Sequence, residues 1–253
     1  MPLDWHSMTE SIDQNLEHLP EHIQSWAREL GFSDVGITLP DTGAHGARLK
    51  DWLRKGFHGE MSYMEDHGDK RYTPTSLVEG TQRVISVRLD YLPAPDNPGR
   101  ILTNPEKAYI TRYATGRDYH KLMRKRLATL AKRIDEAVSG YDYRAFVDSA
   151  PVLERALAQR AGLGWIGKNN MLIHPKAGSF FFLGEIFTSA PLPLDEPFEK
   201  EHCVSCAACL DICPTDAFEG PHKLDARKCI SYLTIELKGS IPEELRPKMG
   251  NRV

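Results

Sequence analysis

Four cysteines lie in one short run near the C-terminal end of the chain and are followed at once by a proline. The run reads C-x-x-C-x-x-C-x-x-x-C-P and comprises Cys203, Cys206, Cys209, Cys213 and Pro214. This spacing is typical of a loop that presents three thiolates to one [4Fe–4S] cluster, while the fourth cysteine binds a second cluster. The run therefore predicts two clusters and an electron-transfer role.

A zinc site or disulfides could also explain cysteines in a short chain. Zinc sites usually combine two C-x-x-C pairs across a longer gap, which this run lacks. Disulfides suit small secreted chains, and the polar, acidic start of this chain indicates neither export nor a transit peptide. We therefore expect an iron–sulfur protein of the cytoplasm, where thiolates stay reduced.

Length and charge set broad limits. A chain of 253 residues can bury a core in one large domain or two smaller ones. Its formal net charge of -3 excludes an overall polycation but leaves room for a local basic face. No apolar stretch is long enough to cross a bilayer, so we expect no membrane association.

Periodicity predicts helices and strands in the N-terminal half. A helix opening at Pro20 and ending at Gly31 would bury one apolar face, and a second helix would bury Leu49, Trp52 and Leu53. Residues 35–39 read as a short strand, and the alternation over residues 85–91 is that of a half-buried strand. A loop is predicted by three prolines, Pro93, Pro95 and Pro98.

The C-terminal half reads in the same way. Helical spacing runs from about 118 to 138, and a further helix would begin at Pro151 and end at Gly162. Strands are expected over 143–147, 170–174 and 180–187, followed by a linker with Pro191, Pro193 and Pro197. The outline is an α+β domain over residues 1–195 and a small iron–sulfur domain over 196–253.

Two segments of the larger domain are candidates for a functional site. Asp148 lies between a predicted strand and a predicted helix, where functional residues are common, although an acid there can also simply stabilise the helix start. The segment from Gly162 to Asn169 holds three glycines that would allow close approach to a ligand. Neither a phosphate-binding loop nor a Rossmann pattern is present.

These segments, taken with others, resemble the epoxyqueuosine reductases. The resemblance extends over about residues 22–245 and rests on motifs that are specific in combination. They are Asp148-Ser149-Ala150-Pro151 with Arg155, Gly162 to Asn169, the cysteine run, Cys229 to Glu236, Met61 to Met64, Arg71, Arg112 to Ala114, and Gly116 to His120.

The resemblance implies a fold, an activity and a set of cofactors. It implies a nitroreductase-like, cobalamin-binding domain, similar in its core to reductive dehalogenases, followed by a ferredoxin-like domain with two [4Fe–4S] clusters. Such enzymes reduce the epoxide of epoxyqueuosine in the tRNA anticodon loop to queuosine, the last step of queuosine biosynthesis. The implied partners are that tRNA and an external electron donor, and we expect a monomer.

The resemblance also implies roles for single residues. Asp148 would donate a proton, with Tyr119 and Arg155 near the substrate. Because family members bind cobalamin without a protein imidazole below the cobalt, neither His120 nor His174 is assigned as a ligand. Contacts to the cofactor are implied for Arg71, Tyr113, Asp148, Lys168, Asn169, Ser231 and Tyr232.

Simple chemistry agrees with these roles. Removing an epoxide oxygen takes two electrons and protons, and cobalamin and iron–sulfur clusters supply electrons. Asp148 would have to hold its proton near neutral pH, which burial favours and a helix start opposes.

The predicted helix over 118–138, together with Arg117 just before it, is strongly basic. They could follow tRNA phosphates, or they could form an ordinary solvated helix face. Nearby tyrosines, Tyr109, Tyr113 and Tyr119, could stack on bases or on the corrin, or could pack in the core. The basic residues are Arg117, Lys121, Arg124, Lys125, Arg126, Lys132 and Arg133.

The chain departs from the family in its cysteine count. Two cubes need eight ligands, and the sequence has five cysteines. The resemblance assigns Cys203, Cys206 and Cys209 to the first cluster and Cys213 and Cys229 to the second. We therefore read the chain as a shortened form.

Four expectations follow from a shortened form. It would hold at most one labile cluster, and it would bind cobalamin weakly or not at all and lack steady-state activity. It would also expose apolar surface around Ile230, Leu233 and Ile235. Two alternatives stay open, a corrinoid-dependent reductase of a small molecule and an inactive remnant that binds corrinoid or tRNA.

Overall fold

A four-stranded antiparallel sheet forms the centre of the protein, with strand order β1-β2-β6-β3. The computed structural model describes residues 5–92 and 98–253. The strands are β1 (Asp34–Thr38), β2 (Arg83–Asp90), β3 (Tyr143–Phe146) and β6 (Phe181–Thr188). Residues 85–90 of the alternating segment lie in β2, and Tyr91 follows it; the strand is buried on both faces and not half-buried, because Ser86 and Arg88 are buried as well. β6 pairs with both β2 and β3, so the sheet unites segments that are far apart in the sequence.

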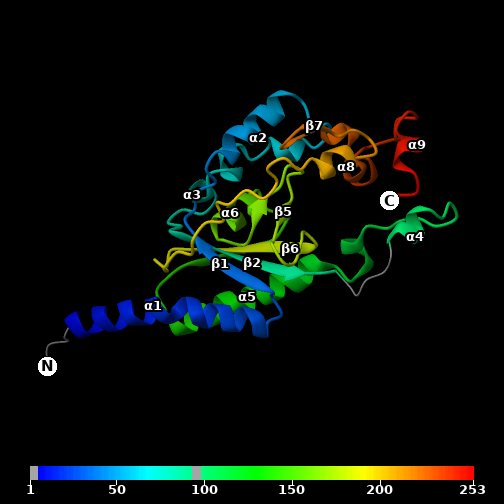
Figure 1. The fold of residues 1–253 in the computed structure, drawn as a ribbon. Helices are drawn as coiled ribbons and strands as arrows, with labels where there is room; N and C mark the ends of the chain where they lie inside the picture. The colour runs from blue at the N-terminus through cyan, green and yellow to red at the C-terminus, as the bar shows by residue number, and fades with distance from the viewer. Residues whose placement is uncertain (1–4, 93–97) are drawn as a thin grey trace.

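Helices cover both faces of this sheet (Figure 1). The helices α1 (Trp5–Glu29) and α5 (Tyr119–Ala137) lie on one face, and α6 (Glu154–Arg160) lies on the other. Successive residues of a strand point to opposite faces, so Ile186 of β6 packs with α1 and α5 whereas Phe187 packs with α6. The sheet thus separates a helix pair from the layer in which α6 lies.

The long helix predicted over 118–138 is confirmed as α5. Its apolar residues Met123, Leu127, Leu130 and Ile134 are buried at helical spacing. Gly184 of β6 permits the contact, because a Cβ atom there would lie 2.9 Å from Cδ1 of Leu127.

The helix start predicted at Pro20 is wrong. Pro20 lies inside α1, which begins at Trp5. A proline within a helix removes one backbone hydrogen bond. Here Leu16 and Leu19 before it and Ile23 after it pack into the same core cluster, and that burial outweighs the lost bond.

Two other proline boundaries are shifted. The helix expected from Pro151 begins at Glu154, because the backbone N–H of Val152 bonds to the carbonyl of Ala150 in a tight turn. Pro98 begins the short helix α4 (Pro98–Leu102) instead of a loop, and Pro93 and Pro95 lie outside the described residues.

The glycine-rich segment forms a small hairpin of β4 (Trp165–Ile166) and β5 (Leu172–Ile173), which shortens the strand expected over 170–174. A Cβ atom on Gly164 would lie 2.3 Å from the carbonyl oxygen of Ile173. At this glycine the close approach is to the chain's own backbone, which corrects the expectation of a ligand contact there.

Short elements complete the larger domain and lead into the cysteine segment. The larger domain also contains α2 (His45–Arg54), α3 (Pro74–Leu77) and 3₁₀ turns at Ser62–Met64, Gly68–Arg71 and Arg112–Thr115. The cysteine segment contains α7 (Ala208–Asp211), β7 (Phe218–Gly220), β8 (Lys223–Leu224), a 3₁₀ turn at Ala226–Lys228, α8 (Ile230–Ile235) and α9 (Arg246–Met249).

The cysteine segment packs against α2 and against the region that follows it. Nε1 of Trp52 donates to the carbonyl of Leu224 at 2.6 Å, and the N–H of Glu60 donates to the Tyr232 hydroxyl at 2.9 Å. Residues 191–201 between the two parts form neither helix nor strand, and the predicted boundary at residue 195 lies there and stays a prediction.

The apolar surface expected around α8 is largely covered. Leu233 is buried in a cluster with Tyr232 and Met249, and Ile230 packs against that cluster. Ile235 alone of the three predicted residues is strongly exposed, at 59%. The expectation therefore fails for Leu233, because it packs in a cluster that includes Met249 of α9.

Among residues 5–92 and 98–253, none of the helices combines the length and apolar character that a bilayer crossing requires.

Candidate active site

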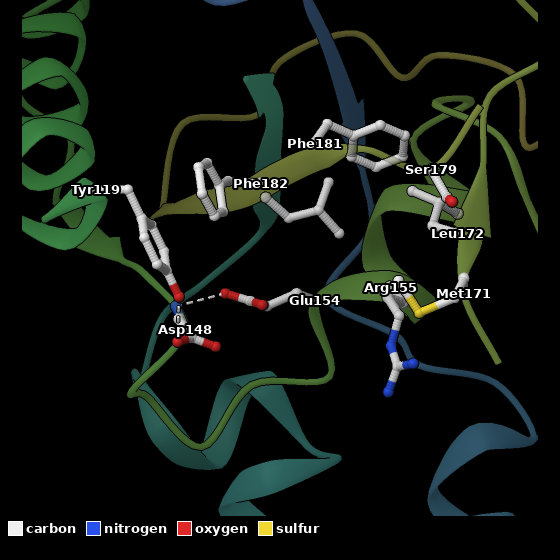
Figure 2. A pocket seen from close by; sticks show the side chains of 10 residues that line it. Tyr119, Asp148, Glu154, Arg155, Met171, Leu172, Ser179, Phe181 and Phe182 are labelled. Carbon is white, nitrogen blue, oxygen red and sulfur yellow. Dashed lines mark hydrogen bonds between the residues drawn. The ribbon is translucent and has the colours of Figure 1, made fainter. Parts of the chain in front are cut away.

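A cavity of about 280 Å³ opens beside the sheet, where the start of α5, the start of α6 and strands β5 and β6 meet (Figure 2). Tyr119, Asp148 and Arg155 are among the polar residues of its wall, and Leu172 and Phe182 contribute apolar surface. The predicted catalytic residues Asp148, Tyr119 and Arg155 are therefore brought to one cavity, although they come from three different segments.

Asp148 lies two residues beyond the end of β3, which is one residue shorter than the predicted strand over 143–147, and it precedes α6. Its φ of +38° is in the left-handed region, which a residue other than glycine adopts at a cost in energy. Its side chain is 55% exposed. The chain alone therefore leaves this carboxyl open to water, and a bound ligand would have to exclude it.

Tyr119, the first residue of α5, holds the Asp148 carboxyl. Its hydroxyl donates to Oδ2 of Asp148 at 2.7 Å, and its ring stacks on Phe182 with the centroids 3.8 Å apart. Burial, followed by the hydrogen bond and charge of Asp148, raises the pKa of Tyr119 far above its ordinary value. Tyr119 is therefore held protonated, as a hydrogen-bond donor.

His120 lies between two carboxylates. Its Nδ1 is 3.0 Å from Oδ1 of Asp118, and its Nε2 is 3.0 Å from Oδ2 of Asp148. The contact with Asp148 is a hydrogen bond only if one of the two atoms carries a proton. The imidazole thus connects the candidate acid to Asp118, whose side chain is half exposed.

His120 lies in a family motif but has no role assigned from the sequence, and this contact is not predicted from it. The available signal was the D-x-H pattern of Asp118 and His120 at a helix start. Asp118 accepts the N–H of His120 as the N-cap of α5, and the hydrogen bond from the His120 side chain lowers the pKa of Asp118.

Arg155 forms another wall of the cavity and donates a hydrogen bond from Nη1 to the carbonyl oxygen of Asn170. The Arg155 side chain is exposed to the solvent in the cavity. The protein atoms packed around it nevertheless desolvate the guanidinium, which lowers the pKa of Arg155. The neighbouring Glu154 also lines the cavity, and its Oε1 accepts the backbone N–H of Asp148 at 2.7 Å. The sequence reasoning did not single out Glu154.

Residues predicted to contact the cofactor lie in several places, and their roles stay predictions. Tyr113 meets the Tyr119 ring edge to face. Arg71 is buried, donates to the carbonyl of Tyr63 at 2.8 Å and has its pKa lowered by burial. Ser231 is exposed at the start of α8, whereas Tyr232 is buried and accepts the Glu60 N–H described above.

Lys168 and Asn169 lie in the turn of the glycine-rich hairpin. Oδ1 of Asn169 accepts the N–H of Met171 at 3.1 Å and closes this turn. Nζ of Lys168 donates to the carbonyls of Val204 and Cys206 at 2.7 and 2.9 Å. Lys168 thereby attaches the start of the cysteine loop to the domain that carries the cavity.

All five cysteines are free thiols. No group of three or more His, Cys, Asp or Glu side chains in the described part of the chain is close enough to hold a metal ion. The sulfur of Cys213 already accepts the backbone N–H of Ala217 at 3.4 Å, a kind of bond that stabilises cluster thiolates. The donor chemistry suits an iron–sulfur site, and binding would require the loop to draw its thiols together.

The basic residues of α5 separate into two groups. Lys121, Arg124 and Lys125 are exposed in the half of the helix nearest Asp148, and Arg124 reaches Oγ of Ser149 at 3.4 Å. Lys132 pairs with Glu136 at 3.5 Å and Arg133 with Glu29 at 2.7 Å. Arg126 lies against Gly31. The first group is the better candidate for an anionic partner.

Comparison with family models matches both parts of the chain. The family described as Epoxyqueuosine reductase QueG, DUF1730, matches residues 71–149, which include Tyr119, His120 and Asp148. The family described as 4Fe-4S double cluster binding domain matches residues 202–253, which include all five cysteines.

Curated relatives agree with this match. An epoxyqueuosine reductase of Pseudomonas aeruginosa is 61% identical over 235 residues, which cover 93% of this chain and 65% of that protein. The epoxyqueuosine reductase of Escherichia coli is 53% identical over 246 residues, covering 97% of this chain and 64% of that protein. The chain thus spans somewhat less than two thirds of the length of these relatives.

Solved structures show the same fold. A crystal structure of epoxyqueuosine reductase with an epoxyqueuosine-modified tRNA stem loop superposes with a TM-score of 0.80 at 33% identity, covering 93% of this chain and 62% of that one. A catabolic reductive dehalogenase shares the fold at a TM-score of 0.51 and 18% identity, covering 89% of this chain and 30% of that one. The resemblance in the motifs is confirmed, and the chain belongs to the epoxyqueuosine reductase family.

Proposed function

We propose that this chain carries the catalytic part of an enzyme that reduces epoxyqueuosine to queuosine in the anticodon loop of tRNA. The observation that carries the proposal is the contact of Tyr119 and His120 with one carboxyl, that of Asp148, at the mouth of a cavity. The sequence match to the family supports the substrate.

The residues around the cavity suit part of a cobalamin. Apolar side chains such as Leu172 and Phe182 can pack against a flat macrocycle, and Arg155 offers a donor to its polar edge. A volume of about 280 Å³ is small for a ligand pocket, so most of the cofactor would lie over the open side, where Asp148 is exposed. When bound, cobalamin would supply the electrons that break the carbon–oxygen bonds.

The protons are the protein's contribution. Loss of an epoxide oxygen as water consumes two electrons and two protons. Asp148 would deliver a proton to the departing oxygen, and Tyr119 would hold the carboxyl in place. His120, which bonds to the same oxygen of Asp148, would return a proton from solvent.

Electrons would reach the cavity through the cysteine segment. The proposed iron ligands are Cys203, Cys206, Cys209, Cys213 and Cys229, and an external donor would reduce the clusters. Lys168 supports this arrangement, because its two hydrogen bonds attach the cysteine loop to the hairpin that borders the cavity. We further propose a cytoplasmic monomer that acts on tRNA.

A single-turnover experiment tests the function without relying on the clusters. The chain is mixed anaerobically with tRNA that carries epoxyqueuosine and with a large excess of chemically reduced cobalamin, which compensates for the weak binding expected of a shortened form, and the nucleosides are analysed by mass spectrometry. We expect queuosine from the parent and none from Asp148→Asn, which keeps the size of the side chain but cannot deliver the proton. The Pseudomonas aeruginosa relative is the positive control.

Three outcomes would contradict the proposal. Turnover by Asp148→Asn within threefold of the parent would remove Asp148 as the acid. Release of halide from a halogenated phenol, with no product from tRNA, would favour the small-molecule reductase. Binding of tRNA or corrinoid without any reduction would favour the inactive remnant.

A further inference from the structure

A second carboxyl lies behind the cavity, in the middle of strand β6. Alternation along β6 turns Glu185 to the same face as Phe187, toward α6. Glu185 is 0% exposed, and its neighbours in the sheet are Ser86 of β2 and Phe146 of β3. Among residues 5–92 and 98–253, no donor reaches either carboxyl oxygen of Glu185. A fully buried carboxyl in this position is costly unless something neutralises it.

The group that faces Glu185 is another carboxyl, that of Glu154 at the start of α6. Two carboxyls can share a hydrogen bond only if one of them carries a proton. Glu154 also reaches the active site, because its Oε1 accepts the backbone N–H of Asp148 at 2.7 Å. Figure 2 shows its side chain pointing across the cavity wall toward Asp148 and Tyr119.

Electrostatics agrees with a shared proton. Burial, and then the neighbouring charge, raises the pKa of Glu154 to about 7 and that of Glu185 well above its ordinary value. Other charged or titratable groups near Glu154 are Asp148, Tyr119 and Arg155. Arg155 favours the ionised form of Glu154, and Asp148 opposes it.

We propose that Glu154 and Glu185 share one proton and act together to position Asp148. This inference rests on the proposed role of Asp148 as the proton donor. With the proton on Glu185, the charge stays on Glu154, and an ionised carboxylate accepts a backbone N–H more strongly than a neutral one. That bond holds Asp148 in its left-handed conformation, at φ +38°. Glu154 and Glu185 are therefore positioning residues, whereas Asp148 is the catalytic residue.

Infrared spectroscopy of the unloaded chain tests the shared proton directly. Exposed carboxyls are ionised at pH 7.5, so a remaining carboxylic acid C=O band reports a buried proton. We expect a band equivalent to about one acid group per chain, which Glu185→Gln removes and Glu79→Gln, at an exposed site, leaves unchanged. Absence of the band from the parent, or its survival in Glu185→Gln, would overturn the proposal. If Glu185→Gln does not fold, the presence or absence of the acid band in the parent spectrum tests the proposal by itself.

Amide hydrogen exchange tests the positioning. The N–H of Asp148 should exchange at least about tenfold faster in Glu154→Leu, which has no acceptor, because a lost hydrogen bond of about 1.4 kcal/mol changes an opening equilibrium tenfold. Glu154→Gln keeps an acceptor oxygen but carries no charge, and it should restore only part of the protection. Equal exchange in the parent and in Glu154→Leu would overturn the positioning role.

These measurements separate the inference from the function it rests on. Neither uses cobalamin, clusters or tRNA. If the shared proton and the protected amide are found but Asp148→Asn still turns over, the proposed function of Asp148 fails and the carboxyl pair stands. If Asp148→Asn is inactive and the acid band is absent, the pair fails alone.

Discussion

The hydroxyl of Tyr119 donates a 2.7 Å hydrogen bond to Oδ2 of Asp148, and it joins the first turn of α5 to the end of β3. The ring of Tyr119 is at the same time stacked on Phe182 of β6. The candidate acid is therefore held by a side chain that the sheet itself keeps in place.

We expect Tyr119→Phe to keep the stacking and lose only the hydrogen bond. A bond to a charged group contributes about 1.5–3 kcal/mol, so the single-turnover rate should fall roughly ten- to a hundredfold. The affinity for tRNA should not change. A rate within threefold of the parent, in a variant that binds tRNA normally, would show that Tyr119 only packs the core.

Asp118 has two roles that substitution can separate. It caps α5 by accepting the N–H of His120, and it faces the imidazole of the same residue. Asp118→Ala should destabilise the chain by about 1 kcal/mol, while Asp118→Asn should keep most of the cap. Urea unfolding measures this difference. Equal losses in the two variants would mean that the charge, and not the cap, stabilises the helix start.

The exposed basic group near Asp148 should contact tRNA phosphates. Replacing Lys121, Arg124 and Lys125 with glutamine should weaken binding and flatten its salt dependence, by about 0.7–0.9 in the log–log slope for each lost contact. Replacing the ion-paired Lys132 and Arg133 is the matched control and should change the slope little. An unchanged slope in the first variant would make this part of α5 an ordinary solvated face.

The carboxyl pair should make stability depend on pH. An unfolded Glu has a pKa near 4.5, and both carboxyls have raised pKa values in the folded chain. Above pH 4.5 the folded state binds more protons than the unfolded state. Its stability therefore falls as pH rises, by up to about 1.4 kcal/mol per pH unit for each proton.

Glu185→Gln should remove much of this dependence. The free energy of unfolding of the parent should fall more steeply between pH 5 and pH 8 than that of Glu185→Gln. The difference between the two proteins should therefore shift in favour of the variant as pH rises, as measured by urea unfolding at both pH values. Glu79→Gln, at an exposed site, is the control and should follow the parent. The same stability difference between Glu185→Gln and the parent at both pH values would contradict a raised pKa for Glu185.

Five cysteines limit how much iron the chain can bind. One cube takes four cysteine ligands and two take eight, so anaerobic reconstitution should give at most about four irons per chain. Lys168→Met should make this iron easier to remove by chelators, because the cysteine loop loses its attachment to the hairpin. Iron analysis measures both. About eight irons per chain would show that ligands other than cysteine complete the second cluster.

Local patterns in the sequence were enough to predict much of the fold. The helical spacing of Met123, Leu127, Leu130 and Ile134 predicted α5, because one buried face requires that period. Alternation of apolar and polar residues predicted the strand β2, although the strand is buried on both faces and not on one. The rule for Pro20 failed, because tertiary packing on both sides of the proline outweighs one missing hydrogen bond.

The candidate site was predicted only in part. Motifs that resemble the family pointed to Asp148, Tyr119 and Arg155, which do line one cavity. The contact between His120 and Asp148 was missed, because these residues are far apart in the sequence and only the packing of α5 against the sheet brings them together.

The sequence by itself determined the cysteine run, the family and the amphipathic elements, because each depends on residues close together along the chain. The tertiary structure alone decided that Glu185 faces Glu154. Within the mainly apolar segment 180–187, Glu185 looks like a polar interruption, and its direction depends on how β6 pairs with β2 and β3. A shift of one residue in that pairing would turn every side chain of β6 to the other face and separate the two carboxyls.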